Sequence, residues 1–129
     1  MVEKEILYPE LSYKIIGCAF EVFNEIGGGH KELTYHKALK VSFENVLLKY
    51  EENLYWPIKF KSVVVEKGFF DFLVEEKIVV ELKRSDHFSK SHFEQLNHYL
   101  RVSKLQLGLL ISFTTNGVRF KRVVNLQQH

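Results

Sequence analysis

The chain has 129 residues, of which 46% are hydrophobic and 26% charged, and its formal net charge is +2. This composition is typical of one soluble globular domain, and the weak positive charge is compatible with a nucleic-acid partner without requiring one. No run approaches the roughly 20 apolar residues of a membrane span, and the charged N-terminus does not resemble a signal peptide. The single cysteine, Cys18, excludes an internal disulfide and a cysteine-based zinc site, so we expect an intracellular, cytoplasmic protein.

The first expected element is an amphipathic helix over residues 10 to 26, directly after Pro9. Its apolar residues recur at helical spacing: Leu11, Ile15, Cys18, Ala19, Val22 and Ile26. Cys18 lies on this stripe, which favours a small core residue over a nucleophile. The glycines at positions 27 to 29 are expected to end the helix, because glycine readily takes the left-handed conformation of a helix cap.

A second helix is expected from about residue 30 to residue 50. Its predicted buried face consists of Tyr35, Ala38, Leu39, Phe43, Val46, Leu47 and Tyr50. Glu32 lies in its first turn, where the helix dipole favours a carboxylate. After residue 53 the periodicity drops to two, which predicts strands at 54 to 60 and 61 to 67 or one long bent strand. Pro57 favours an edge strand or a bulge there, and Gly68 indicates a turn or bulge.

Residues 69 to 83 form two apolar runs joined by a charged turn at residues 75 to 77. In a hairpin with this turn Val74 pairs with Ile78, and Asp71 lies opposite Glu81. Directly opposed residues share a face, with Cβ atoms about 5 Å apart. Two facing carboxylates repel each other unless a proton or a cation lies between them. The pattern therefore favours a divalent cation with oxygen ligands, such as Mg²⁺.

The alternative is an edge hairpin whose polar face is solvated, with Glu81 and Lys83 as ordinary surface residues. The apolar neighbours on that face, Phe69, Leu73 and Val79, disfavour an edge position.

The remaining residues predict a helix, a buried strand and a closing strand. The helix is expected from about residue 90 to residue 102, and the apolar run 105 to 113 is expected to be a central strand. A helical crossover permits this strand to join the sheet in parallel. Asn116-Gly117 predicts a turn before a strand at 118 to 124. The order of elements predicts an α/β fold, or α+β on a stricter definition, with a mixed central sheet flanked by helices.

Several motifs together resemble a known group of proteins. Asp71, followed ten residues later by Glu81-Leu82-Lys83, resembles the PD-(D/E)XK nuclease superfamily, although Phe70 stands where the motif has its proline. Gly29-x-x-Glu32-x-x-Tyr35 resembles the signature of the GxxExxY family, which is assigned to that superfamily. Further similar segments are Leu11–Gly17, Phe20–Gly27 and Gly108–Phe113, so the resemblance covers about residues 10 to 124. Gln95-x-x-x-Tyr99 resembles a motif of RecB-like exonucleases.

The resemblance implies a single nuclease domain over residues 1 to 129 with a restriction-endonuclease-like core. It implies a metal-dependent nuclease acting on nucleic acid, with DNA the expected substrate and Mg²⁺ or Mn²⁺ the cofactor. The implied catalytic and metal-binding groups are Asp71, Glu81, Lys83, Glu32 and the backbone carbonyl of Leu82. The implied substrate-binding residues are Gln95, Tyr99 and Arg84.

The residues leave simpler roles open for some of these side chains. Glu32 can act only as a helix cap, and Tyr35 can be a core residue. Tyr99 can pack in the core while Gln95 faces solvent. For the whole chain, the alternatives to an active nuclease are a non-catalytic module that binds nucleic acid or protein, and a structural protein that forms a homodimer through its aromatic-rich first strands.

Overall fold

The computed structural model describes residues 7 to 83 and 88 to 126 of the chain. Within these ranges the helices are α1 (Pro9–Ile26), α2 (Glu32–Asn45) and α3 (Lys90–Ser103). The strands form one sheet in chain order: β1 (Tyr50–Phe60), β2 (Val63–Val74), β3 (Ile78–Lys83), β4 (Leu107–Phe113) and β5 (Val118–Val124). Strands β3 and β4 run parallel, and the other neighbours are antiparallel. The predicted mixed sheet of an α+β fold is thus confirmed.

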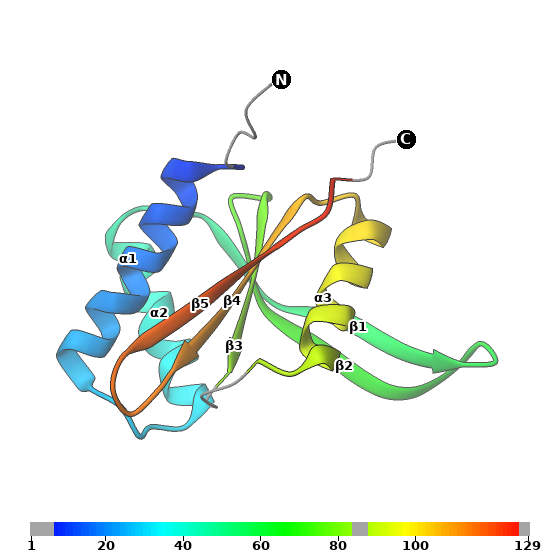
Figure 1. The fold of residues 1–129 in the computed structure, drawn as a ribbon, viewed down its shortest axis with the longest axis horizontal. Coiled ribbons are helices and arrows are strands. Elements are labelled where there is room, and N and C mark those ends of the chain that lie inside the picture. Colours follow the sequence, from blue (N-terminus) through cyan, green and yellow to red (C-terminus); the bar gives the residue numbers. More distant parts are fainter. Residues whose placement is uncertain (1–6, 84–87, 127–129) are drawn as a thin grey trace.

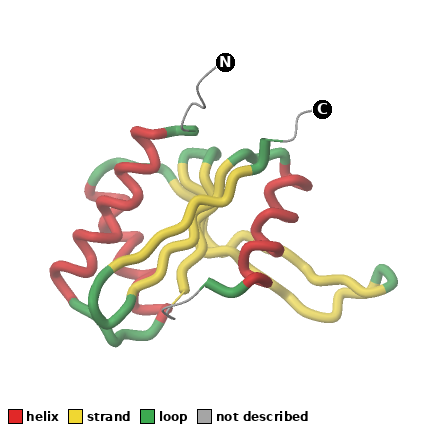
Figure 2. Tube along the Cα trace, viewed as in Figure 1, coloured by secondary structure: helices red, strands yellow, loops and turns green. Residues whose placement is uncertain are grey.

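Helices cover both faces of the sheet, with α1 and α2 on one side and α3 on the other (Figure 1; Figure 2). Each side has its own core cluster of buried apolar residues. The bounds of α1 and α3 agree with the predicted helices to within one residue. None of the helices in the described ranges is both long and apolar enough to cross a membrane.

The hairpin of β2 and β3 lies in the middle of the sheet. Val74 pairs with Ile78, which is the register expected from a turn at residues 75 to 77. Alternate residues of β3 face opposite sides: Leu82 belongs to the cluster under α1 and α2, and Val79 to the cluster under α3. Because β3 lies between β2 and β4, the alternative of a solvated edge hairpin is wrong.

Helix α2 is shorter than predicted because the chain reverses at Leu47. Leu47 has a left-handed φ of 62°. Its amide donates to the Glu44 carbonyl, and the Leu48 amide donates to the Phe43 carbonyl. This pair of bonds is the Schellman arrangement that ends many helices, usually with glycine at the left-handed position. The expected burial of Val46 and Leu47 is wrong, since they are 43% and 87% exposed, whereas Leu48 is buried.

Strands β1 and β2 form one long hairpin whose turn differs from the prediction. Tyr50 begins β1 instead of ending α2. The turn lies at residues 61 and 62, whose φ values of 50° and 67° suit a type I′ turn. Gly68 is not in a turn or bulge: it pairs with Trp56, and a Cβ there would lie 2.7 Å from the Trp56 carbonyl oxygen. Pro57 does lie on an edge strand, beside a register shift in the ladder.

The outer part of this hairpin, residues 54 to 69, projects from the body of the protein and is called the arm below (Figure 1). Asn53, at its base, has a left-handed φ of 58°. The ladder has no pair between Asn53 and Asp71, although pairs form on both sides of them. Residues two apart on a strand normally point to the same face. Here Phe72 packs under α1 and α2 whereas Phe70 packs under α3, so the side chains change faces between them. Asp71 therefore lies where the sheet passes into the arm.

Candidate active site

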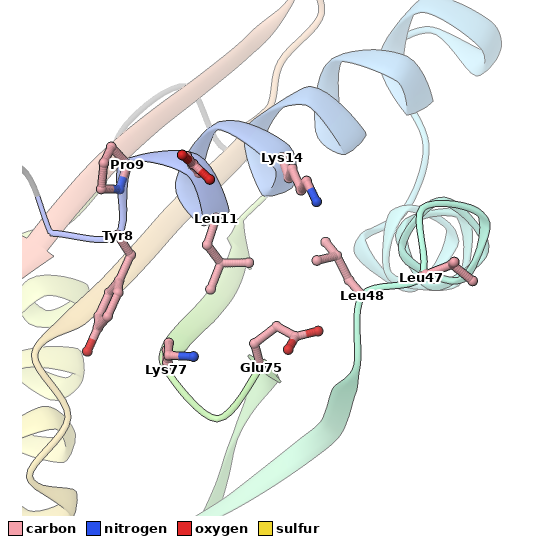
Figure 3. Close-up of a pocket in the computed structure, with 9 residues that line it drawn as sticks. Tyr8, Pro9, Leu11, Lys14, Leu47, Leu48, Glu75 and Lys77 are labelled. Atoms are coloured by element: carbon pink, nitrogen blue, oxygen red, sulfur yellow. The ribbon is translucent and has the colours of Figure 1, made fainter.

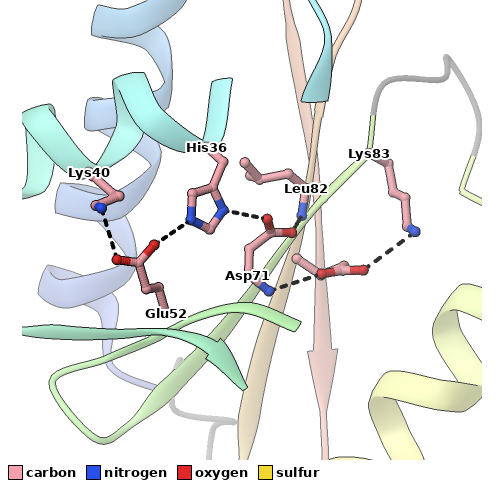
Figure 4. Close-up of polar contacts among 7 residues, drawn as sticks. His36, Lys40, Glu52, Asp71, Leu82 and Lys83 are labelled. Carbon is pink, nitrogen blue, oxygen red and sulfur yellow. Dashed lines mark hydrogen bonds and ion pairs between the residues drawn. The ribbon is translucent and has the colours of Figure 1, made fainter. Parts of the chain in front are cut away.

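The carboxylates of Asp71 and Glu81 meet between β2 and β3 (Figure 4). The Asp71 amide donates to Glu81 Oε1 at 3.2 Å, and the Leu82 amide donates to Asp71 Oδ2 at 2.9 Å. Lys83 Nζ lies 3.4 Å from Glu81 Oε2. The hairpin register thus brings the predicted metal ligands together with the predicted catalytic lysine.

Glu81 is in an unfavourable place for a negative charge. Burial raises the pKa of Glu81 to about 9, and the hydrogen bond and charge of Asp71 act in the same direction. The charge of Lys83 lowers this pKa, but its effect is smaller. Without a cation Glu81 therefore keeps its proton at neutral pH. A divalent cation beside the two carboxylates would supply the positive charge that the pair lacks.

Glu32 lies in the first turn of α2, with its side chain exposed. Burial and the charge of Lys83 lower the pKa of His92 on α3, while the charge of Glu32 raises it. The charges of Glu32 and Lys83 are therefore both felt at His92, in opposite directions. Tyr35 is a core residue, 1% exposed, and its hydroxyl donates to the Gly27 carbonyl at 2.7 Å.

The predicted substrate-binding residues lie on or before α3. Gln95 is exposed, and Tyr99 is half-buried with its ring against Trp56 and Phe70, at centroid distances of 5.2 Å and 4.9 Å. Burial, followed by the charge of Glu51, raises the pKa of Tyr99. The ring packs as the simpler reading of Tyr99 expects, and its role toward substrate stays a prediction. Arg84 lies outside the described residues.

Sequence reasoning missed three side chains that are connected to Asp71 through successive polar contacts. His36 Nδ1 lies 2.7 Å from Asp71 Oδ1, and His36 Nε2 lies 2.9 Å from Glu52 Oε1 (Figure 4). Lys40 Nζ lies 2.8 Å from Glu52 Oε2. His36 and Lys40 are four residues apart, hence on one face of α2, which is visible in the sequence. Nothing local connects them to Asp71, because that contact depends on how α2 packs on the sheet.

Comparison with known proteins identifies the superfamily of the chain. A model of the PD-(D/E)XK nuclease superfamily matches residues 9 to 123. The chain belongs to the PD-(D/E)XK nuclease superfamily. No curated protein matches the chain. Among solved structures, the crystal structure of SSO0001 is similar, with 18% sequence identity and a TM-score of 0.47 over 99% of this chain and 71% of that one.

PD-(D/E)XK nucleases generally use divalent metals such as Mg²⁺. No group of three or more His, Cys, Asp and Glu side chains within residues 7–83 and 88–126 is arranged to hold a metal ion. Mg²⁺ does not need such a group, because it keeps several waters and binds through one or two carboxylates and the substrate phosphate. Asp71 and Glu81 supply two adjacent carboxylates, whose oxygens are the ligands that a hard cation prefers. These residues fit a hard divalent cation.

A pocket of about 530 Å³ lies away from these carboxylates (Figure 3). It is lined by the start of α1, by the segment after α2 and by the β2–β3 turn, including Tyr8, Leu48 and Lys77. None of the predicted site residues lines it. This pocket and the predicted site therefore share no residue.

Proposed function

We propose that this protein is a metal-dependent nuclease that hydrolyses phosphodiester bonds in DNA, built as a single domain of the GxxExxY group. The observation that carries the proposal is the pairing of Asp71 with Glu81, with Lys83 on the same face and 3.4 Å from Glu81. The superfamily membership supports a nucleic-acid substrate. Mg²⁺ or Mn²⁺ is the proposed cofactor.

In this mechanism Asp71, Glu81 and the carbonyl of Leu82 would hold the cation, and Glu32 would complete the set from the start of α2. When bound, the metal lowers the pKa of a water molecule and screens the charge of the scissile phosphate. Lys83 would orient that water and, as a cation, stabilise the negative charge that develops on the phosphate, while the water's proton is released to solvent. Attack of that water's oxygen on phosphorus would break the bond to the leaving oxygen.

Basic side chains on α3, directly after it and on β5 are proposed to bind the nucleic-acid backbone without reading bases. The proposed contacts are Lys90, Arg101, Lys104, Arg119 and Lys121, together with Gln95, Tyr99 and Arg84. Arg122 has a different use: its guanidinium donates to Ser12 Oγ at 3.0 Å and to the Leu7 carbonyl at 2.8 Å. It ties β5 to α1 and is left out of the proposed surface.

The test is cleavage of single- and double-stranded DNA and RNA with Mg²⁺ or Mn²⁺, using the unaltered protein, Asp71→Ala and Lys83→Ala. Both substitutions should abolish cleavage while the circular dichroism spectrum and urea midpoint show that the protein is folded. Glu76→Ala, in the exposed β2–β3 turn, is the matched control and should cleave normally. Undiminished cleavage by either site variant would refute the assignment.

A second candidate function is a non-catalytic module that binds nucleic acid or protein. The exposed arm favours it, since a binding surface can act without the carboxylate pair. Titration of Mn²⁺ separates the two, because a non-catalytic module has no need to bind metal at Asp71 and Glu81.

The arm is also proposed to pack against a second copy of the chain. Its exposed apolar side chains are Tyr55, Phe60, Val63, Val64, Val65 and Phe69, which are 42% to 64% exposed. They present on the order of 500 Å² of apolar surface, given about 150–250 Å² for a whole aromatic side chain. Two arms would bury about 1,000 Å², near the lower limit of a specific interface. Phe60→Asp should shift the protein from dimer to monomer in analytical ultracentrifugation, and a monomeric unaltered protein would exclude this dimer.

A further inference from the structure

His36 lies in a chain of polar contacts that begins at the surface and ends at Asp71 (Figure 4). From the surface inwards the members are Lys40, Glu52, His36 and Asp71, with successive distances of 2.8 Å, 2.9 Å and 2.7 Å. His36 is only 6% exposed, and its ring stacks on Phe72 at a centroid distance of 4.3 Å. The His36 ring is thus held at both nitrogens by carboxylates and on one face by Phe72.

We propose that His36 is a positioning residue for Asp71, and that Glu52 and Lys40 fix His36 so that the Asp71 carboxylate is oriented for the metal. This inference rests on the proposed function, because it concerns how the proposed metal ligand is held. Neither His36 nor Glu52 is assigned any other part in the reaction.

Asp71 needs such support because of its place in the sheet. It lies opposite the left-handed Asn53, at the one position near the base of the arm where the β1–β2 ladder lacks a pair. Besides its hydrogen bond with Glu81, its carboxylate accepts from the Leu82 amide at Oδ2 and contacts His36 Nδ1 at Oδ1. An ionised carboxylate has about four lone-pair sites, so both oxygens can keep these contacts and still bind a cation. Removing His36 would leave Oδ1 without this contact and the side chain freer to rotate.

Glu52 acts on the far side of the ring. Hydrogen bonds from Lys40 and then His36 lower the pKa of Glu52, so this carboxylate is ionised at neutral pH. It holds Nε2 of His36, which leaves Nδ1 directed at Asp71. Partners that orient a ligand from behind typically change metal affinity 10- to 100-fold when they are removed. Glu52 is linked to Asp71 through the His36 ring and is not a proposed metal ligand. Substitution of Glu52 therefore tests positioning separately from metal ligation.

The experiment measures Mn²⁺ affinity by electron paramagnetic resonance titration without nucleic acid. His36→Ala and Glu52→Ala should each raise the Mn²⁺ Kd about 10- to 100-fold while leaving one binding event at saturation. His36→Asn should recover part of the loss, because its amide can still donate to Asp71. Matched controls are Lys37→Ala and Glu51→Ala, exposed neighbours outside these contacts, and they should leave the Kd unchanged. If His36→Ala does not fold, Glu52→Ala and His36→Asn still carry the test.

Three results would overturn the proposal in different ways. An unchanged Kd in folded Glu52→Ala and His36 variants would refute positioning while leaving the proposed function intact. A ¹⁴N coupling to bound Mn²⁺ in pulsed spectra, lost in His36→Ala, would make His36 a ligand and not a positioning residue. No Mn²⁺ binding by the unaltered protein would refute the proposed function itself, and this inference with it.

Discussion

Glu81→Gln is expected to stabilise the metal-free protein, although it removes a proposed metal ligand. Glu81 has an ordinary pKa of 4.5 when exposed and a pKa of about 9 in the fold, chiefly because it is buried. Between these pH values the folded protein keeps a proton that the unfolded chain releases. The contribution of Glu81 to stability is therefore fully present below pH 4.5 and is lost as the pH rises towards 9. Glutamine has the shape of the protonated acid and does not titrate.

The size of the effect follows from the two pKa values. Each pH unit in this window costs the unaltered protein about 1.4 kcal/mol, and pH 7 lies about 2.5 units above the unfolded value. Glu81→Gln should therefore raise the free energy of unfolding at pH 7 by about 3 kcal/mol. The difference between variant and unaltered protein should be near zero close to pH 4.5 and should widen as the pH increases.

The assay is urea unfolding at pH 5, 6, 7 and 8 in the presence of EDTA, followed by circular dichroism. Glu76→Gln in the exposed β2–β3 turn is the matched control, and it should show no widening difference. A constant difference between Glu81→Gln and the unaltered protein from pH 5 to pH 8 would refute the argument that Glu81 is protonated in the metal-free fold. Added Mn²⁺ should reverse the order, stabilising the unaltered protein more than the variant.

Two backbone positions give further predictions. Asn53→Gly should leave the urea midpoint nearly unchanged. Asn53→Val should lower the free energy of unfolding by about 1–2 kcal/mol, because a left-handed φ of 58° is costly for a β-branched residue. Equal midpoints for the two variants would contradict this. Gly108→Ala should destabilise by about 1–3 kcal/mol through overpacking, because the new Cβ would lie 2.7 Å from Cδ2 of the fully buried Leu96. Gly17→Ala in α1, with no atom within 4 Å of the new Cβ, is its control and should stabilise slightly in the same unfolding assay.

The parts of the fold that the sequence predicted well are those in which one physical signal dominates. The charged turn at residues 75 to 77 between two apolar runs sets the hairpin register, and that register alone brings Asp71 and Glu81 together. The strongly apolar run of β4, interrupted only by Ser112, predicts a strand buried on both faces, and each of its seven residues is buried.

Other parts depend on contacts that no local pattern contains. The end of α2 at Leu47 uses a left-handed leucine, so the usual glycine signal for a helix end is missing. The change of face at Asn53 has no signature in the alternation of apolar residues. His36 reaches Asp71 only after α2 has packed on the sheet, and the sequence offers no reason to pair residues 35 positions apart. These are tertiary effects, and they were available only from the structure.

The parallel pairing of β3 with β4 has a consequence for how the chain folds. The two carboxylates lie in a single hairpin, so their contact closes a short loop and can form early. The edge of β3 that does not face β2 has no hydrogen-bond partner until β4, which follows α3 in the chain, pairs with it. During that interval an apolar strand, buried on both faces in the final fold, offers an unpaired edge to other chains. Truncation before β4 is therefore expected to yield aggregates in which the carboxylate hairpin is already paired.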